Sequence, residues 1–424
     1  MPEPSDKPST AVLHYTAPPV VGGVEAVIWA HAQVFLREGY PLAVVAGRGE
    51  SSALPPGVEF LPFIEMDSRH PSIYRVNLAL EQGEVPSEFD SLVSGLTDSL
   101  ASVLQEFDNV IVHNLFTKHF NLPLTAALFR LLDSETLRGC IAWCHDFSWT
   151  SPNAARYVSE GYPWDLLRTY HPDLTYVTVS KERQVVLAEL LGCPTDQIHV
   201  VYNGVDPQGL LGLTKQGMEL VERLDLLESD LNLLMPVRVT QAKNIEFALQ
   251  MAATIKGMGL RLKLVLTGPP DPHDERSMGY YQSLQAMRNR LGLEHEMHFV
   301  FEAGPDPQQP FTIDAQVVGD LYRVADAVFM PSHREGFGMP VLEAGLSGIP
   351  VISTAIPAAV EIGGEEVLLF SPDDDPAATA ARLVDWVGAQ PSYRLRRRVR
   401  QKYTWQSIFQ RDIQPLLKGR ARGD

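Results

Sequence analysis

The 424-residue sequence has few cysteines and no excess of positive charge. Its three cysteines, Cys140, Cys144 and Cys193, cannot all pair, and no C-x-x-C spacing occurs. This usage fits a reducing compartment and argues against a disulfide framework. The formal net charge is −17, whereas a protein that binds nucleic acid needs a basic surface to neutralise phosphates. We therefore expect no nucleic-acid partner.

Long apolar segments are also missing. The first ten residues are polar and lack the apolar core of a secretory signal. No stretch approaches the ~18 apolar residues of a membrane-spanning helix. Between Arg48 and Asp108, eleven acidic residues stand against three basic ones, a balance that anionic lipids would repel. We expect a cytoplasmic protein without membrane association, and we interpret the basic run Arg394–Lys402 as a solvated helix face.

Short β-branched runs alternate with amphipathic stretches along the chain, which predicts parallel sheets covered by helices. The predicted strands are Ala11–Tyr15, Pro41–Ala46, Val58–Pro62, Val110–His113, Cys140–Trp143, Tyr176–Val179, Ile198–Tyr202, Leu233–Val239, Leu262–Leu266, Met297–Phe301, Ala327–Met330, Pro350–Ser353 and Val367–Phe370. So many strands are more economically placed in two doubly wound sheets than in one. The turn residues of Asn203–Pro207 mark the break between the two.

This break divides the chain into three parts. We predict an N-terminal Rossmann-like, acceptor-binding domain over residues 1–207 and a C-terminal Rossmann-like, nucleotide-sugar-binding domain over residues 208–400. Residues 401–424 are expected to form a helix that returns to the N-terminal domain. In open parallel sheets, ligands bind beyond the carboxyl ends of the strands. Function is therefore expected in the loops that follow strands.

The most informative loop follows the predicted strand Ala327–Met330. It reads P-S-H-R-E-G-F-G-M-P-V-L-E-A from Pro331 to Ala344. Its glycines permit a tight turn, and Pro340 suits the first turn of a helix. Free amides at such a helix start attract phosphates or polarised hydroxyls. Glu335 on the loop and Glu343 on the helix could then serve two parts of one ligand.

This segment resembles the motif of the family-4 retaining glycosyltransferases, in which two glutamates are separated by seven residues. The downstream run Gly348–Ile352 and the segment Ala359–Ile362 are similar to further elements of that family. The resemblance implies the α/β GT-B fold, with two doubly wound Rossmann-like domains facing across a cleft. It also implies that Glu335 contacts the hydroxyls of the donor sugar and that Glu343 holds the ribose. Phe337, Gly338 and Met339 would lie near the sugar and the phosphates.

Two cations complete the implied donor site. Arg238 and Lys243 resemble the family's G-R-x-x-x-x-K segment, which clamps the diphosphate, although Val237 stands where the family usually has glycine. Fixed cations can stabilise a leaving diphosphate without a metal. The Asp373–Asp375 run, the nearest candidate for a metal-binding Asp-x-Asp, is better interpreted as a helix-capping loop. Gly22 and Gly23 open a predicted helix and resemble the family's G-G-V-E loop, so we place them in donor binding.

The predicted strand Cys140–Trp143 is followed by His145 and Asp146. A His-Asp pair at a strand end could be a general base with its orienting carboxylate. By resemblance, His145 contacts the donor sugar and lines the reaction centre, while Asp146 supports the loop or faces the acceptor. Asn114, after the strand Val110–His113, is either a structural loop residue or a contact to the acceptor. We expect Asn203–Asp206 to serve hinge geometry at the domain junction.

Together with these residues, the family resemblance implies a metal-independent, retaining hexosyltransferase with a nucleotide diphosphate sugar as donor and no cofactor. UDP-glucose, GDP-mannose and ADP-glucose stay open as donors. A small soluble sugar, glycoside or polyol is the expected acceptor. The alternatives are a lipid- or polysaccharide-directed enzyme of the same family and a non-catalytic nucleotide-sugar-binding protein. The oligomeric state, with a homodimer among the alternatives, and the roles of the segments Asp67–Phe89 and Glu302–Val317 also stay open.

Overall fold

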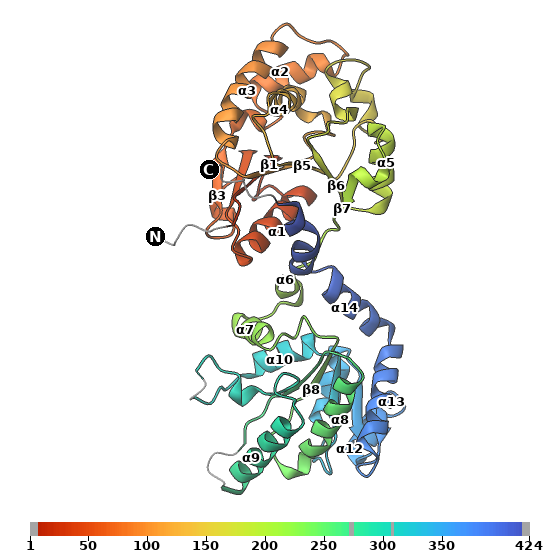
Figure 1. The fold of residues 1–424 in the computed structure, drawn as a ribbon. Coiled ribbons are helices and arrows are strands. Elements are labelled where there is room, and N and C mark those ends of the chain that lie inside the picture. Colours follow the sequence, from red (N-terminus) through yellow and green to blue (C-terminus); the bar gives the residue numbers. More distant parts are fainter. Residues whose placement is uncertain (1–6, 271–274, 307–308, 418–424) are drawn as a thin grey trace. The chain divides into compact units, whose positions relative to one another are not determined.

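The structure is a computed structural model that describes residues 7–270, 275–306 and 309–417 (Figure 1). The chain divides into two compact units. Unit 1 comprises Met1–Val205 together with Trp405–Asp424, and unit 2 comprises Asp206–Thr404. The first change of unit therefore falls inside the predicted junction segment, next to Asp206. None of the helices in the described ranges is long and apolar enough to cross a membrane.

Unit 1 is built on a parallel sheet. Over the described residues the sheet has seven strands in the order β3-β2-β1-β4-β5-β6-β7. The strands are β1 (Thr10–Thr16), β2 (Leu42–Arg48), β3 (Glu59–Pro62), β4 (Asn109–His113), β5 (Cys140–Cys144), β6 (Thr175–Thr178) and β7 (Ile198–Val200). Each predicted run of the first half forms one of them. The strand order reverses between β1 and β4, and open sheets of this kind bind ligands at such a reversal.

Helices cover both faces of this sheet (Figure 1). The helices are α1 (Gly23–Arg37), α2 (Pro71–Leu80), α3 (Phe89–Leu104), α4 (Leu122–Asp133), α5 (Lys181–Leu191) and α15 (Trp405–Ile408). Alternate side chains of a strand point to opposite faces. Accordingly, Leu13 packs in the cluster that contains α3 and α4, whereas Val12 packs in the cluster that contains α1.

The C-terminal segment completes the core beside α1. Ile408, Phe409 and Ile413 are fully buried there, and the rings of Phe35 and Phe409 lie 4.9 Å apart, edge to face. Its backbone is less regular than the single amphipathic helix that the pattern predicts. After α15 it forms a π-helical turn over Phe409–Ile413 and a 3₁₀ turn over Gln414–Leu416.

Unit 2 contains a second parallel sheet. Among the described residues it has six strands in the order β10-β9-β8-β11-β12-β13. The strands are β8 (Leu231–Met235), β9 (Leu262–Leu266), β10 (Met297–Phe299), β11 (Ala327–Met330), β12 (Val351–Thr354) and β13 (Leu368–Phe370). Two doubly wound α/β units are therefore confirmed. As in unit 1, the order reverses between two adjacent strands, here β8 and β11.

Two layers of helices enclose the second sheet. The helices are α6 (Pro207–Leu211), α7 (Lys215–Arg223), α8 (Ile245–Gly257), α9 (Glu275–Arg290), α10 (Ala315–Val324), α11 (Met339–Ser347), α12 (Pro357–Gly363), α13 (Pro376–Ala389) and α14 (Pro391–Lys402). Helices α8 and α13 pack on the face of Leu233, and α7 and α10 pack on the face of Leu234. The predicted capping loop is confirmed, because Asp375 accepts a hydrogen bond from the backbone N–H of Ala378 at the start of α13.

The prediction for the strand Leu233–Val239 is wrong at its end. Strand β8 stops at Met235, because Pro236 has no N–H to donate to a neighbouring strand. Val237 and Val239 are nevertheless buried in the core of unit 2. Arg238 therefore lies on a segment that follows the strand, between two anchored apolar residues.

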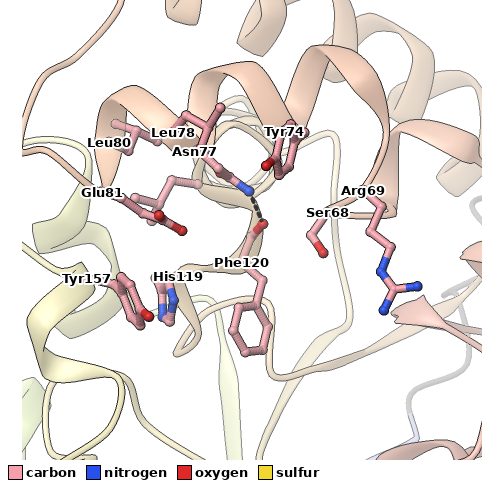
Figure 2. A pocket seen from close by; sticks show the side chains of 11 residues that line it. Ser68, Arg69, Tyr74, Asn77, Leu78, Leu80, Glu81, His119, Phe120 and Tyr157 are labelled. Atoms are coloured by element: carbon pink, nitrogen blue, oxygen red, sulfur yellow. Dashed lines mark hydrogen bonds between the residues drawn. The ribbon is translucent and has the colours of Figure 1, made fainter.

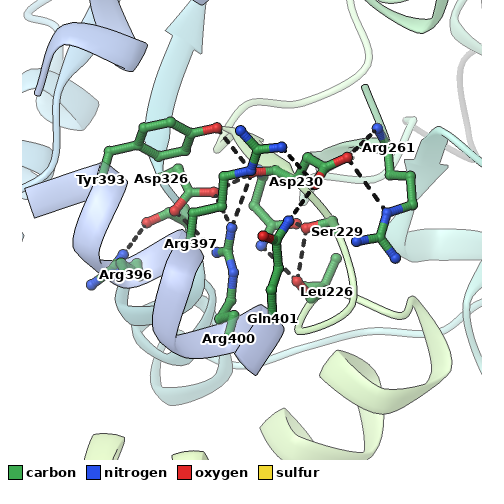
Figure 3. Close-up of polar contacts among 12 residues, drawn as sticks. Leu226, Ser229, Asp230, Arg261, Asp326, Tyr393, Arg396, Arg397, Arg400 and Gln401 are labelled. Atoms are coloured by element: carbon green, nitrogen blue, oxygen red, sulfur yellow. Dashed lines mark hydrogen bonds and ion pairs between the residues drawn. The ribbon is translucent and has the colours of Figure 1, made fainter. Parts of the chain in front are cut away.

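The interpretation of Arg394–Lys402 as a solvated helix face is also wrong in part. Figure 3 shows three arginines of α14 directed at the sheet end of unit 2. Arg400, buried, lies 2.8 Å from Asp326, and Arg397 lies 3.0 Å from Asp230. Arg396 donates a hydrogen bond to the carbonyl of Ala325. These ion pairs and this hydrogen bond hold α14 against its own unit.

Candidate active site

The reversal point of unit 2 brings two of the predicted donor-site residues together. Lys243 follows β8 and Glu335 follows β11, and these strands are neighbours in the sheet. The Nζ atom of Lys243 lies 2.6 Å from both carboxylate oxygens of Glu335. Ser332 donates a hydrogen bond to Oε1 of the same carboxylate at 2.6 Å. The side chains of Lys243 and Glu335 are only 18% and 10% exposed, so their charges interact with little screening by water.

Arg238 lines an open pocket of about 1000 Å³ in unit 2. Arg276 from the first turn of α9 and Arg334 from the loop after β11 line the same pocket. Within the described part of the chain, neither Arg238 nor Arg334 forms an ion pair. The guanidinium groups of Arg238 and Arg334, with that of Arg276 in the same pocket, are suited to a polyanion such as a diphosphate.

Sequence reasoning missed Arg276 and Arg334. Arg334 stands next to Glu335 in the same motif, so its position in the loop could have marked it. Arg276 gave no signal, because it begins a helix whose approach to Arg238 depends on the order of the strands. Val237 stands where the family usually has glycine, and the backbone of Gly268 passes close to Val237 and Arg238. A Cβ atom on Gly268 would lie 2.6 Å from the carbonyl oxygen of Val237.

The loop before α11 places the remaining donor-site candidates. Gly338 has a φ of 81°, which glycine adopts without the strain a side chain would add. It lies at the N-terminus of α11, beside Pro340 in the first turn. Phe337 and Met339 are 62% and 52% exposed, so both can be reached by a ligand. Glu343, inside α11, accepts a hydrogen bond of 2.5 Å from Tyr322 of α10.

His145 of unit 1 follows β5 and is held by neighbours from β4. Its Nε2 atom lies 3.0 Å from Nδ1 of His113. The amide oxygen of Asn114 accepts hydrogen bonds from the backbone N–H groups of His145 and Asp146, at 2.8 and 3.3 Å. Asn114 is buried and has a φ of 61°. The structure therefore gives Asn114 a part in shaping the loop that carries His145.

Burial keeps the imidazole of His145 neutral. It lowers the pKa of His145 to about 4, with a smaller effect in the same direction from His14. The pKa of His113 is lowered well below its ordinary value, first by burial and then by the neighbouring histidines. The carboxylate of Asp146 lies 3.5 Å from Arg183. The residue that contacts the ring of His145 is thus His113 rather than Asp146.

The predicted glycine loop opens α1. Helix α1 begins at Gly23, with Gly22 as the preceding cap residue. The side chain of Glu25 folds back over this point, and a Cβ atom on Gly22 would lie 2.0 Å from its Oε2. Thr16, at the end of β1, donates a hydrogen bond to Glu25. A carboxylate of the chain itself therefore lies against this helix start.

Unit 1 also contains a pocket of about 340 Å³ (Figure 2). Its walls include Tyr74, Asn77 and Glu81 around α2, and His119 and Tyr157 from the segments after β4 and β5. His119 stacks on Tyr157, with ring centroids 5.2 Å apart. The segment Asp67–Phe89 thus provides the helix α2 and one wall of a pocket. The other segment whose role the sequence leaves undecided is Glu302–Val317. It includes residues 307–308, which lie outside the described ranges.

Two family models match the two halves of the chain. Glycosyltransferase Family 4 matches residues 21–208, and Glycosyl transferases group 1 matches residues 219–403. The chain belongs to the group 1 glycosyltransferases of family-4 type and is a transferase enzyme. Together with the two parallel sheets, this membership gives the α/β GT-B fold that the sequence predicts.

Several curated glycosyltransferases are similar to the chain. An uncharacterized glycosyltransferase of Methanocaldococcus jannaschii is 24% identical over 59% of this chain and 61% of that protein, less than two thirds of its length. Mannosylglucosylglycerate synthase of Petrotoga mobilis is 22% identical over 70% of this chain and 72% of that protein. A D-inositol 3-phosphate glycosyltransferase of Saccharomonospora viridis is 25% identical over 89% and 82%, respectively.

Proposed function

We propose that this enzyme transfers a hexose, with retention of its anomeric configuration, from a nucleotide diphosphate sugar to a hydroxyl of a small soluble acceptor. UDP-glucose, GDP-mannose and ADP-glucose are the candidate donors. The observation that carries the proposal is the convergence of Lys243 and Glu335 at the reversal point of unit 2. It places a cation and a carboxylate in one site, which is the pair that a sugar diphosphate requires.

The charges of unit 2 fit the two parts of such a donor. Arg238 and Arg334 can bind diphosphate oxygens through planar, bidentate groups. Lys243 has three N–H donors, and two of them suffice for the oxygens of Glu335. The third is available for a phosphate oxygen. Glu335 would accept hydrogen bonds from the hydroxyls of the sugar, while Lys243 keeps its charge compensated.

These fixed cations take the role that a metal ion has in other transferases. As the bond between the sugar carbon and the phosphate oxygen breaks, negative charge develops on the diphosphate, and the arginines and Lys243 stabilise it. The acceptor oxygen forms the new bond to the sugar carbon on the same face, and its proton passes to the leaving phosphate oxygen. No carboxylate nucleophile is required. We therefore propose a reaction that is independent of metal.

The acceptor would bind in unit 1. The pocket beside α2 is about 340 Å³, within the size range of small-molecule sites. Its aromatic walls and the polar groups of Asn77 and Glu81 suit the mixed surface of a sugar or polyol. The names of two relatives refer to D-inositol 3-phosphate and to mannosylglucosylglycerate. Polar molecules of this kind support a small acceptor over a lipid.

The proposal is tested by a transfer assay in excess EDTA. Each candidate donor is combined with a panel of sugars, polyols, sugar phosphates and a polyprenyl phosphate, and products are identified by mass spectrometry and NMR. We expect one donor to give a product of retained configuration with a soluble acceptor. Replacing Glu335 by Ala should lower the rate by about 100-fold or more while the melting temperature stays close to that of the wild type.

Other outcomes of this assay would favour a different acceptor, a different mechanism or a non-catalytic protein. Transfer only to the polyprenyl phosphate would replace the small acceptor by a lipid carrier. An absolute need for manganese, or a product of inverted configuration, would contradict the proposed mechanism. Binding of a nucleotide sugar without any transfer or hydrolysis would favour a binding protein.

A further inference from the structure

Four buried histidines lie behind the candidate reaction centre of unit 1. They are His14 on β1, His31 on α1, His113 at the end of β4 and His145 after β5, and each is at most 9% exposed. The ring of His113 lies 5.3 Å from that of His31 and 5.2 Å from that of His145. Such a group is costly to bury, so its hydrogen bonds determine where each proton resides.

The proton between His113 and His145 can be assigned from what surrounds it. The two rings share one hydrogen bond, between Nδ1 of His113 and Nε2 of His145, at 3.0 Å. One of these nitrogens must carry the proton, and burial lowers the pKa of both residues, so each ring has a single N–H. Either His113 donates to His145 or His145 donates to His113.

The environment of the other nitrogen of His113 decides between these arrangements. Nε2 of His113 is buried and has no hydrogen-bond partner in the described structure. The rings of His31 and Trp143 lie nearby, 5.3 and 5.7 Å from the ring of His113. If His145 were the donor, His113 would carry its own proton on Nε2 as an orphaned, buried N–H. His31 and Trp143 already carry buried ring N–H groups without a partner in the described structure. A further orphaned N–H on His113 would add to this unfavourable group of donors, whereas a bare lone pair at Nε2 of His113 adds none.

We infer that His113 is a positioning residue that donates its Nδ1 proton to His145 and so fixes His145 as the Nδ1–H tautomer. The lone pair on Nε2 of His145 then accepts the hydrogen bond from His113. Its Nδ1–H has no partner among the described residues and is not among the buried, unsatisfied atoms. This group therefore faces the open side of the loop as a hydrogen-bond donor.

This assignment changes the chemistry available to His145. A neutral imidazole whose lone pair is occupied cannot remove the acceptor's proton, so His145 can only donate a hydrogen bond to an oxygen. Resting on the proposed function, the ligand of this N–H is a hydroxyl or ring oxygen of the transferred sugar. The acceptor's proton is then left to the departing phosphate, in agreement with the proposed mechanism.

The tautomer can be measured without any substrate. In a protein labelled with ¹⁵N-histidine, long-range ¹H–¹⁵N spectra distinguish Nδ1–H from Nε2–H rings, and the signals of His145 are those lost in His145→Gln. We expect the Nδ1–H pattern, unchanged between pH 8 and about pH 6, near the ordinary histidine pKa. An Nε2–H pattern for His145 in the folded wild type would overturn the inference.

Variants of His113 separate positioning from simple packing. His113→Asn keeps an N–H donor close to the position of Nδ1, whereas His113→Leu removes it. The exposed His199 of β7, replaced by Asn, is the matched control. We expect kcat/KM to fall by roughly 10- to 100-fold in the Leu variant, as for other small misplacements of reacting groups, and to be largely restored in the Asn variant. Equal losses in both folded variants would contradict a role for the donated proton.

The inference and the proposed function fail in different ways. If no nucleotide sugar is bound or consumed by the wild type, the proposed function fails, while the tautomer measurement still reports on His145. If transfer occurs and His145 is the Nε2–H tautomer, the function stands and the inference falls.

Discussion

Both glutamates of the loop and helix after β11 are oriented by hydrogen bonds from neighbouring side chains. Glu335 is held by Lys243 and Ser332, and Glu343 by Tyr322. A carboxylate that is already oriented loses less conformational freedom when a ligand binds. Burial, followed by the contact with Glu343, raises the pKa of Tyr322, so Tyr322 stays protonated and serves as the donor of this hydrogen bond.

Replacing Tyr322 by Phe should weaken donor binding. The variant removes one hydrogen bond to Glu343 and leaves the aromatic ring in the core. Hydrogen bonds to charged groups contribute about 1.5–3 kcal/mol, so we expect the dissociation constant of the nucleoside diphosphate to rise by roughly 10-fold or more. Calorimetric titration measures this directly.

A matched tyrosine in the same unit provides the control for this variant. Tyr281 donates a hydrogen bond to Glu302, and neither residue is among the predicted donor-site residues. Tyr281→Phe should lower stability by a similar amount without changing nucleotide affinity. Equal affinities in both variants would show that Tyr322 has no special part in the site.

The residues that act through others were the hardest to predict from the sequence. Glu335, Glu343, Arg238, Lys243 and His145 stand in motifs with recognisable spacing. Tyr322 has no such mark, and His113 belongs, with Asn114, only to a weaker element of the family resemblance. The roles of Tyr322 and His113 depend on which strands and helices become neighbours. Asn114 was noticed, but its hydrogen bonds to the backbone of His145 could not be foreseen from its position in the chain.

At the scale of elements, α14 is fastened to unit 2 by charge pairs. Arg400 and Asp326 are 7% and 0% exposed, and their nearest atoms are 2.8 Å apart. Asp326 also accepts a hydrogen bond from the backbone N–H of Asn232 at the start of β8. The pair therefore connects the last helix of the unit to the amino-terminal ends of the two central strands, β8 and β11.

Breaking this pair should destabilise the unit. Arg400→Met leaves the carboxylate of Asp326 buried without its cation, which costs about 3–5 kcal/mol in comparable cases. Arg398→Met, at an exposed position of the same helix, should change the free energy of unfolding by at most about 0.5 kcal/mol. Urea unfolding of both variants tests this. A loss that is equally small in both would mean that the pair contributes no net stability.

The elements themselves could be predicted well where their pattern is strong. All thirteen predicted runs overlap a strand of the structure, because a parallel strand buried on both faces is a continuous apolar run. The end of β8 was misplaced, since the valines beyond Pro236 are buried without being in the sheet. Helix α2 was not predicted from the sequence, although its buried residues Ile73, Val76 and Leu80 have helical spacing.

For the whole molecule, the predicted site residues are divided between the two units. Each sheet reverses its strand order at one place. In unit 2 the predicted site residues follow the two strands at that place, whereas in unit 1 Gly22 and Asn114 follow β1 and β4, and His145 follows the next strand, β5. Unit 2 carries the cations and the glutamates, and unit 1 carries His145 and the small pocket beside α2. The sequence could predict this division, because the donor motif and the His-Asp loop lie in different halves of the chain. It could not specify the base or the acceptor, which depend on the shapes of the pockets.

The central claim is that unit 2 binds a nucleoside diphosphate through Lys243 and its neighbouring arginines. Calorimetric titration of the full chain with UDP, GDP and ADP in excess EDTA tests it most directly, with Lys243→Ala as the variant and Lys215→Ala, at a 92% exposed side chain, as the control. We predict that one nucleotide binds selectively, that Lys243→Ala weakens it by roughly 10-fold or more, as expected for a charge-assisted hydrogen bond, and that Lys215→Ala leaves it unchanged. No binding of any nucleotide, or an unchanged affinity in Lys243→Ala, would contradict the account.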